Sequence, residues 1–407
     1  MIEDGLASQI FFSKEAADYL GISVQRLNKL VQTGKITPLK KNSSGTIFHI
    51  AELEKRKQEL AIFKEIGVKG ESRMFKIDTP TKNEALNFSV LMNVLGYSER
   101  KLSPLFDKAS TAFDTFKPII DNVSEWAFFF KVPSVSLIEQ YLVAKSEFEK
   151  LKASDEIIKL GDLNYPELLS RTEEAPRFLY LRGDRSLLHD SRTVALVGSR
   201  NASDEGRRNT ERVVMMLGRN GIIIVSGLAK GIDVTAHATA LEHGLKTIAV
   251  IGTNLNQYYP GENKDVQLAI EKKGLVVSQF SPATRTERWF FPLRNGVMSG
   301  ISQATVIMEA GETSGALKQA SFALKQKHLV LIPQNVCRLS SITWPEKLIR
   351  KGAIRVNTPK DIINELARHK VYKTNDGFEF NFENDLFNNM IVAEDEEKYV
   401  VSESGKD

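Results

Sequence analysis

This sequence has little cysteine and no long apolar run, and each absence narrows what the chain can be. Cys337 is the single cysteine among 407 residues, which excludes an intramolecular disulfide and any zinc or iron–sulfur site built from several cysteines. A reducing cytoplasm is therefore the expected location. No apolar run reaches the roughly 20 residues of a membrane-spanning helix, and the first ten residues lack the features of a signal peptide. We expect a protein that is neither exported nor membrane-bound.

The composition is that of a folded protein with more than one core. Hydrophobic residues make up 42% of the chain and charged residues 26%, which excludes a disordered or collagen-like chain. At roughly 100–200 residues per domain, the length predicts two to four domains. The formal charge of +4 conceals an asymmetry, because residues 376–407 carry −8 and residues 1–375 carry +12. A basic body of this kind is suited to bind polyanions.

Four regions differ in their residue pattern. Residues 8–60 hold two short amphipathic helical patterns, a polar turn and a strand, the outline of a winged helix-turn-helix. We interpret residues 61–154 as a linker and a small helical module, and residues 371–407 as an acidic tail. Residues 155–370 alternate short β-branched runs with helical segments, which predicts an α/β fold with a doubly wound, mostly parallel Rossmann-like sheet. The apolar runs expected to form buried parallel strands are 193–198, 221–227, 246–252, 275–279, 304–310 and 327–333.

Glycines, hydroxyls and basic residues follow several of these strands. In an open α/β sheet, ligands bind beyond the carboxyl ends of the strands, where helix N-termini offer unpaired N–H groups. Glycine permits close approach of the backbone, and a guanidinium suits a phosphate. The candidate phosphate-binding residues are Gly198, Ser199, Arg200, Asn201, Ser226, Gly227, Lys230, Gly231, His237, Arg294, Asn295, Ser314 and Gly315. Together they predict an anion pocket for either a nucleotide or a nucleic-acid backbone.

Several of these residues have a structural interpretation as well. Asp233 is expected to cap the helix that contains His237, and the histidine itself is better explained by a structural role. Glu309 ends a strand, where a carboxylate can either act in catalysis or accept hydrogen bonds from the backbone. Without a paired acid or a metal-ligand set we assign no catalytic residue and no metal site.

The segment 285–294 combines cations with aromatic rings. Arg285, Arg288 and Arg294 surround Trp289 and two phenylalanines, a combination that binds phosphates and stacks on bases. Burial of these aromatics in the core is an equally good interpretation.

Multi-residue motifs over roughly residues 160–355 resemble the DNA-processing protein A family, called DprA or Smf. They are DLNYPELL (162–169), APRFLYLRGD (175–184), VALVGSR (194–200), IIIVSGLAKGIDVTAHATAL (222–241), TIAVIGTNLNQYYPGEN (247–263), FFPLRNGVMSG (290–300) and VIMEAGETSGALKQA (306–320). The resemblance implies a homodimer that binds single-stranded DNA at the strand-end pocket and loads a RecA-type recombinase during natural transformation. It implies no cofactor and no turnover.

Three positions depart from the family pattern. Gln279 stands where the family has glutamate, Gly296 where it has arginine, and Gln334 where it has glycine. The missing arginine removes one expected phosphate contact. The segment EAGETSGA also lacks the Gly-Gly-x-Gly-Thr turn and catalytic glutamate of related lysine-decarboxylase-like hydrolases, which disfavours hydrolysis.

Residues 13–33 resemble the helix-turn-helix of MerR-like and excisionase-like proteins. Ser13 and Ser23 are expected N-caps, Gly21 forms the turn, and Leu27, Leu30 and Val31 form the inward face. The residues expected to face duplex DNA are Gln25, Arg26, Asn28 and Lys29, with Lys40 and Lys41 in a wing. A protein-interaction winged helix is the alternative.

Other functions stay open from the sequence. One is a nucleotide-binding sensor or hydrolase of the same superfamily, in phage-related or defence biology, with DNA contacts confined to the N-terminal module. Another is a protein adaptor. The acidic tail is interpreted either as a competitor of DNA for the basic groove, as a site for a basic partner, or as a solvated disordered segment.

Overall fold

The structure is a computed structural model that describes residues 10–32, 36–42, 45–54, 57, 75–190, 192–338 and 342–369. The chain divides into two compact units, Met1–Met74 and Phe75–Asp407. Most of the predicted linker and the predicted acidic tail lie outside the described residues. Within the described ranges, every helix is too short or too polar to cross a membrane.

The first unit contains a three-stranded sheet and two helices joined by a tight turn. The strands β1 (Ile10–Phe12), β3 (Gly45–His49) and β2 (Lys40–Asn42) form an antiparallel sheet in that order. The helices α2 (Ser13–Leu20) and α3 (Val24–Gln32) are joined at Gly21, whose φ of +64° favours glycine. The apolar sides of both helices meet Phe48 of β3 in a small core.

The second unit is built on a nine-stranded sheet, and the predicted mostly parallel α/β fold is confirmed. The strand order is β12-β11-β10-β6-β7-β8-β9-β5-β4, and pairing is parallel from β12 to β9. The strand-pattern prediction did not include β4 and β5, which pair antiparallel at one edge. The strands are β4 (Glu156–Lys159), β5 (Phe178–Gly183), β6 (Thr193–Gly198), β7 (Ile223–Ser226), β8 (Thr247–Val250), β9 (Leu275–Ser278), β10 (Ala304–Glu309), β11 (Leu329–Pro333) and β12 (Ile354–Val356).

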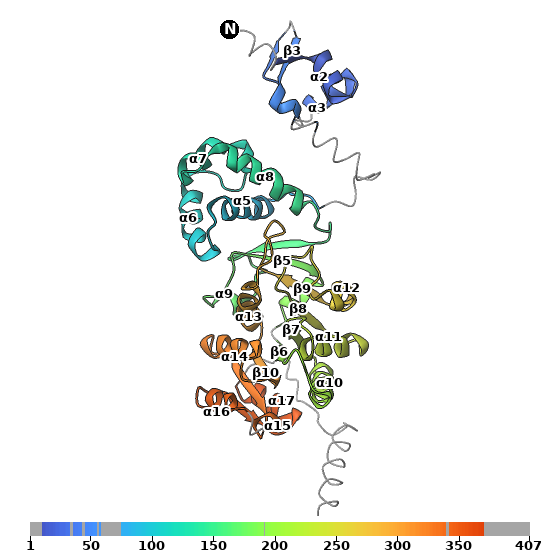
Figure 1. Cartoon of the computed structure of the whole chain (residues 1–407), viewed down its shortest axis with the longest axis vertical. Coiled ribbons are helices and arrows are strands. Elements are labelled where there is room, and N and C mark those ends of the chain that lie inside the picture. The colour runs from blue at the N-terminus through green and yellow to red at the C-terminus, as the bar shows by residue number, and fades with distance from the viewer. Residues whose placement is uncertain are drawn as a thin grey trace, which may run out of the picture. The chain divides into compact units, whose positions relative to one another are not determined.

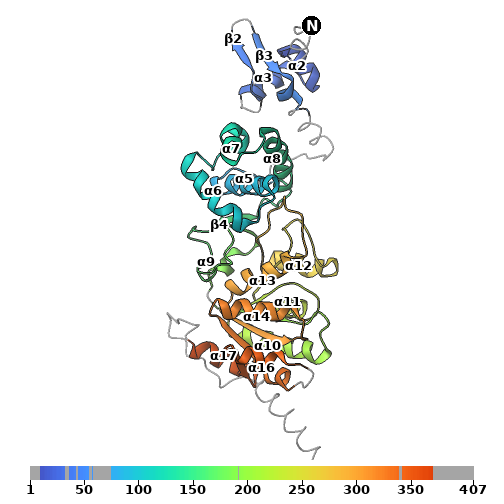
Figure 2. The same ribbon diagram turned by 60° about the vertical axis from the view of Figure 1, so that its left-hand side comes forward.

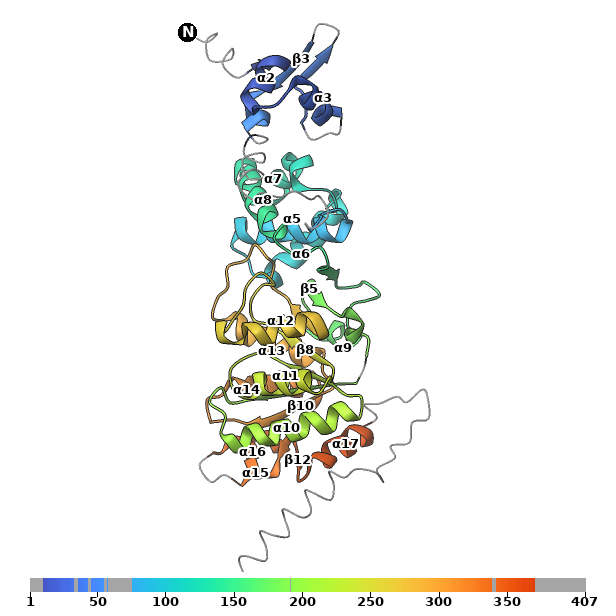
Figure 3. The ribbon, with the colours of Figure 1, turned by 90° about the vertical axis from the view of Figure 1, so that its right-hand side faces the viewer.

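Helices cover both faces of this sheet, as Figure 1 and Figure 3 show. One face carries α10 (Asp204–Arg219), α11 (Ile232–Glu242), α12 (Lys264–Lys273) and α17 (Pro359–Arg368). The other face carries α9 (Glu167–Ser170), α13 (Phe290–Gly300), α14 (Gly315–Lys325), α15 (Gln334–Cys337) and α16 (Trp344–Ile349). Short 3-10 turns lie at η2 (Arg185–Leu188) and η3 (Gly261–Asn263). The β-branched runs are continuous because the inner strands are buried on both faces.

The predicted helical module packs against the β4 edge of this sheet (Figure 2). It consists of α5 (Pro80–Leu95), α6 (Glu99–Ala112), η1 (Ile119–Asp121), α7 (Val123–Phe130) and α8 (Ser134–Phe148). Its core continues into the sheet, because Phe88 of α5 contacts Phe178 of β5 and Phe148 of α8 contacts Tyr180. Residues 75–148 therefore share one hydrophobic cluster with the sheet.

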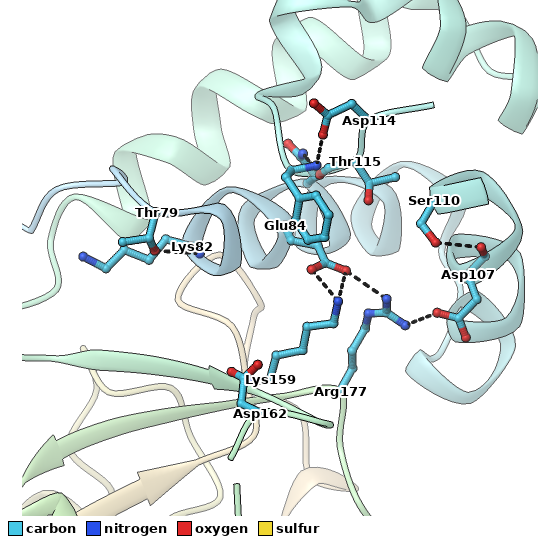
Figure 4. Close-up of polar contacts among 12 residues, drawn as sticks. Thr79, Lys82, Glu84, Asp107, Ser110, Asp114, Thr115, Lys159, Asp162 and Arg177 are labelled. Atoms are coloured by element: carbon cyan, nitrogen blue, oxygen red, sulfur yellow. Dashed lines mark hydrogen bonds and ion pairs between the residues drawn. The ribbon is translucent and has the colours of Figure 1, made fainter. Parts of the chain in front are cut away.

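A buried ion network also joins this module to the sheet (Figure 4). The fully buried Glu84 of α5 accepts hydrogen bonds from Lys159 Nζ of β4 at 2.7 and 2.8 Å and from Arg177 Nη2 at 2.9 Å. Arg177 also binds Asp107 of α6 at 2.6 Å. Burial raises the pKa of nearby Glu99 to about 7, although it accepts a hydrogen bond from the Arg177 N–H. The network fixes α5 and α6 on the sheet edge.

Replacing Glu84 should destabilise the second unit. Glu84→Gln leaves Lys159 and Arg177 without the carboxylate between them, which should lower the free energy of unfolding by about 3 kcal/mol. Urea denaturation of the full chain measures this. The control is Glu167→Gln, which removes the surface pair with Arg171 and should change little. Equal effects of the two variants would contradict the role given to the network.

Candidate nucleic-acid interface

A pocket of about 490 Å³ opens at the carboxyl ends of β6 and β10. The turn after β6, the start of α11, the α13 helix and the start of α14 form its walls. The structure brings together these predicted residues in its lining: Gly198, Ser199, Arg200, Asn201, Arg294, Asn295, Ser314 and Gly315. They come from three separate motifs, which meet because parallel strands end at the same edge.

Two glycines allow the turns of the pocket to approach each other. A Cβ on Gly198 would lie 2.5 Å from Cγ1 of Ile232, and one on Gly231 would lie 2.2 Å from the carbonyl oxygen of Ser199. Gly231 also has a φ of +74°, which L side chains rarely adopt. The Ile232 N–H donates to the Ser199 carbonyl oxygen at 3.2 Å. The start of α11 therefore supports the turn that carries Ser199 and Arg200.

Arg294 forms the buried floor of the pocket. It is 5% exposed, and its Nη1 donates to the carbonyl oxygens of Gly227 and Val250, at the ends of β7 and β8. Its Nε donates to Asn295 Oδ1 at 3.1 Å. Burial lowers the pKa of Arg294 to about 10, so the guanidinium remains charged at neutral pH. Much of its hydrogen-bonding capacity is used within the protein.

Arg200 and Lys318 are the exposed cations that line the pocket. Arg200 was predicted from the turn after β6. Lys318 was not among the predicted residues, and neither was Thr313, which also lines the pocket. The sequence spacing could have indicated Lys318. It lies four residues after Ser314, the N-cap of α14, and therefore on the same side of the helix as Ser314.

Four other predicted residues of the motif after β7 do not line the pocket. His237 is fully buried, with Nδ1 2.7 Å from Thr247 Oγ1, and burial lowers its pKa to about 3. The Ser226 hydroxyl is buried and donates to the Leu196 carbonyl oxygen. Lys230 is exposed and pairs with Glu262 at 2.7 Å. Gly227 lies against Arg294, where a Cβ would meet the guanidinium at 2.5 Å. Ser226, Gly227 and His237 are thus buried, whereas Lys230 lies at the surface.

Two carboxylates, one beside the pocket and one in its lining, accept hydrogen bonds from the backbone. Glu309 accepts hydrogen bonds from the Ser203 N–H at 3.1 and 3.2 Å and from the Ser203 hydroxyl at 2.6 Å, which confirms the backbone-binding interpretation. The expectation that Asp233 caps its helix is wrong, because the N-cap of α11 is Gly231. Asp233 lies in the first turn and accepts a hydrogen bond from the Ala229 N–H at 3.4 Å.

The aromatic segment divides between core and surface. Phe290 is buried and stacks on Phe280 with ring centroids 4.0 Å apart. Phe291 lines the pocket and contacts Tyr259. Trp289 is 53% exposed, and Arg285 and Arg288 are exposed beside it in the sequence. The core interpretation is therefore confirmed for Phe290, whereas base stacking and phosphate binding by the exposed residues stay a prediction.

The departure at Gly296 has a local explanation. A Cβ at this position would lie 2.8 Å from Cγ of Glu174, and Gly296 does not line the pocket. In this chain, α13 packs closely against the segment that follows α9, and a side chain at position 296 would collide with that segment.

The predicted contact residues of the helix-turn-helix lie on its surface. Gln25, Arg26, Asn28 and Lys29 are exposed on α3, whereas Leu27 is buried. Lys40 is exposed on β2, and the side chain of Lys41 lies outside the described part of the structure. Ser23 accepts a hydrogen bond from the Arg26 N–H, as expected of an N-cap. The same expectation for Ser13 is wrong, because Ser13 is the first residue of α2.

The described residues contain no group of three or more histidine, cysteine, aspartate or glutamate side chains that could hold a metal ion. The described lining of the pocket offers cations, hydroxyls and amide groups, which can contact an anion, and one carboxylate, Asp233.

The two pocket arginines should differ in their effect on stability. Arg294→Ala leaves the Gly227 and Val250 carbonyl oxygens without their donor and should lower the free energy of unfolding by about 3 kcal/mol. Arg200→Ala should leave thermal unfolding almost unchanged because the side chain is exposed. Differential scanning fluorimetry of the full chain compares them, and equal melting temperatures would contradict the anchoring role of Arg294.

Comparison with known proteins identifies the family. Residues 156–367, just over half of the chain, match the family described as DNA recombination-mediator protein A. The DNA processing protein DprA of Streptococcus pneumoniae is 38% identical over 221 residues, which are 54% of this chain and 76% of that protein. DprA of Bacillus subtilis is 32% identical over 217 residues, 53% of this chain and 73% of that protein. The X-ray structure of the S. pneumoniae protein has a TM-score of 0.57 and 29% identity, and the match covers 70% of this chain and 98% of that chain. The chain therefore belongs to the DNA recombination-mediator protein A family, the DprA/Smf proteins of DNA processing.

Proposed function

We propose that this protein binds single-stranded DNA through the strand-end pocket without chemical turnover. The observation that carries the proposal is the convergence of Arg200, Lys318 and the capped start of α14 on one pocket. Arginine, lysine and helix N-termini are the groups that contact phosphates in nucleic-acid complexes. The family's resemblance and the +12 charge of residues 1–375 support the same ligand.

The surroundings of the pocket supply a surface for bases. Trp289 and Tyr259 are each 53% exposed, and Tyr259 contacts the pocket-lining Phe291 at a centroid distance of 5.0 Å. Stacking on aromatic rings is tolerant of base identity. We therefore propose that phosphates enter the pocket while bases lie against these rings, without sequence preference.

Two further parts of the proposal concern assembly. By the family resemblance, the protein acts as a homodimer and transfers its bound strand to a RecA-type recombinase. The first unit adds duplex binding through α3 and the wing, because exposed Gln25, Arg26 and Asn28 are side chains that reach bases and phosphates in a major groove. A chain that binds both a single strand and a duplex is suited to bind a junction between single-stranded and duplex DNA.

Loss of either exposed pocket cation should weaken strand binding. Arg200→Ala and Lys318→Ala should each lower the affinity for a fluorescent oligothymidine about tenfold. Each should also reduce the slope of log affinity against log salt by about 0.7, because one phosphate contact is lost. Fluorescence anisotropy of the full chain over a salt series measures both quantities.

The matched control for Lys318→Ala is Lys272→Ala, at the end of α12 and outside the pocket lining. It should leave affinity and salt slope nearly unchanged. The pocket is not the strand-binding site if wild-type protein binds no oligothymidine at low salt. The same conclusion follows if Lys272→Ala lowers the affinity and the salt slope as much as Lys318→Ala does.

The two DNA sites should respond to different substitutions. Arg26→Ala should weaken binding of a hairpin duplex and leave oligothymidine binding unchanged, whereas Arg200→Ala should do the reverse. Anisotropy titrations with both ligands and both variants test this. A loss of oligothymidine binding in Arg26→Ala would contradict the assignment of duplex and single-strand binding to separate sites.

A small nucleotide is the second candidate ligand, because a volume of about 490 Å³ is within the range of small-molecule sites. Native mass spectrometry of the purified protein detects such a ligand, and a nucleotide-hydrolysis screen tests for turnover. A bound nucleotide or a measurable hydrolysis rate would favour this candidate over strand binding.

A further inference from the structure

Asp233 is the one carboxylate among the described residues that line the pocket. It is 6% exposed and lies in the first turn of α11. The other charged residues of the lining are Arg200, Arg294 and Lys318, all cationic. An acidic side chain inside a phosphate site is unexpected, because it repels the ligand.

The protein holds this carboxylate with its own backbone. Asp233 Oδ2 accepts a hydrogen bond from the Ala229 N–H at 3.4 Å, in the turn after β7. The start of α11 is fixed against the turn after β6, where the Ile232 N–H binds the Ser199 carbonyl oxygen and Gly231 leaves no space for a side chain. Asp233 therefore lies where the two turns meet, within the part of the pocket that backbone amides would otherwise offer to a ligand anion.

We propose that the Asp233 carboxylate selects ligands by their negative charge. The pocket then accepts a singly charged phosphodiester and disfavours a doubly charged phosphomonoester. This proposal rests on the proposed function, because it concerns the same pocket. It distinguishes an internal phosphate of a DNA strand from a free nucleotide.

The selectivity follows from the charges of the two ligands. An internal phosphodiester carries one negative charge, whereas a phosphomonoester has a second pKa near 6 and carries about two charges at pH 8. Repulsion by a fixed carboxylate grows in proportion to ligand charge, and at an effective dielectric constant of about 20 one added charge several ångströms away changes the affinity by about tenfold or more.

Asp233 must be ionised to act in this way, and its surroundings set that state. Burial raises the pKa of Asp233, while the charge of Arg294 on α13 and the N–H groups of Ala229, Gly227 and Gly198 oppose the rise. Arg200 and Lys318 face the pocket from the turn after β6 and from α14. His237, one turn along α11, is neutral at pH 7 since its pKa is lowered to about 3. A ligand phosphate adds a negative charge beside the carboxylate, so it should raise the pKa of Asp233 and cause proton uptake.

The test compares two thymidine ligands with the full chain at pH 8. Thymidylyl-thymidine has a single phosphodiester, and thymidine 5′-monophosphate has a dianionic monoester. Each competes with fluorescent oligothymidine for wild-type protein, Asp233→Asn and Glu242→Gln. The control Glu242→Gln removes one negative charge from the exposed end of the same helix, outside the pocket lining.

The expected result is a change in the ratio of the two dissociation constants. In Asp233→Asn the affinity for the monophosphate should rise about tenfold relative to the affinity for the dinucleotide. In Glu242→Gln the ratio of the two dissociation constants should equal that of the wild-type protein. Asparagine preserves an oxygen that can accept the Ala229 N–H, so the fold should survive. An unchanged ratio in a folded Asp233→Asn variant would overturn the proposal.

A second measurement compares proton uptake by the wild-type chain, Asp233→Asn and Glu242→Gln. Calorimetric titration of thymidylyl-thymidine at several pH values from 4 to 8, in buffers of different ionisation enthalpy, measures protons taken up on binding. Uptake that Asp233→Asn loses and Glu242→Gln retains supports the proposal, and an absence of uptake by the wild-type chain across pH 4–8 would overturn it. Failure of the proposed function has a different signature: oligothymidine would not bind the wild-type protein. That result would overturn both proposals, whereas unchanged strand binding with an unchanged ratio would overturn only the role of Asp233.

Discussion

The pocket depends on a close approach of backbone segments at the carboxyl edge of the sheet. Gly198 and Gly231 leave no side chains between the turn after β6 and the start of α11, and a single Cβ at either position would collide with its neighbour. Arg294 completes this arrangement from the opposite face, where its guanidinium binds the carbonyl oxygens at the ends of β7 and β8. The strand ends, two turns, the starts of α11 and α14 and the middle of α13 thus form one closely packed edge.

This closely packed edge explains how cations with different surroundings serve different purposes. Arg294 is buried and holds the protein together, whereas Arg200 and Lys318 are exposed and available to a ligand. Asp233 introduces a negative charge into the same pocket, which reduces the attraction for highly charged small anions. Under the proposed function, a DNA strand would compensate for this reduction because it offers several phosphates and bases to the surface around the pocket.

Local patterns were sufficient to predict the parallel strands and the turns after them. The buried β-branched runs have no other simple interpretation, and glycines at strand ends indicate close approach. The structural role of His237 was predicted from its place on the helix after β7, and its contact with Thr247 agrees with it. The anchoring role of Arg294 could not be predicted in this way, because it depends on carbonyl groups 44 and 67 positions away in the sequence. The packing of α5–α8 against the sheet could not be predicted either, because it depends on the ion pairs of Glu84 with Lys159 and Arg177.

The most direct test of the central claim is hydrogen–deuterium exchange of the full chain with and without oligothymidine. Binding at the strand-end pocket should slow exchange of the amides in residues 199–201 and 313–318, the segments that line it. Slowed exchange confined to residues 10–54, with the pocket segments unchanged, would show that the first unit holds the strand and would contradict the account.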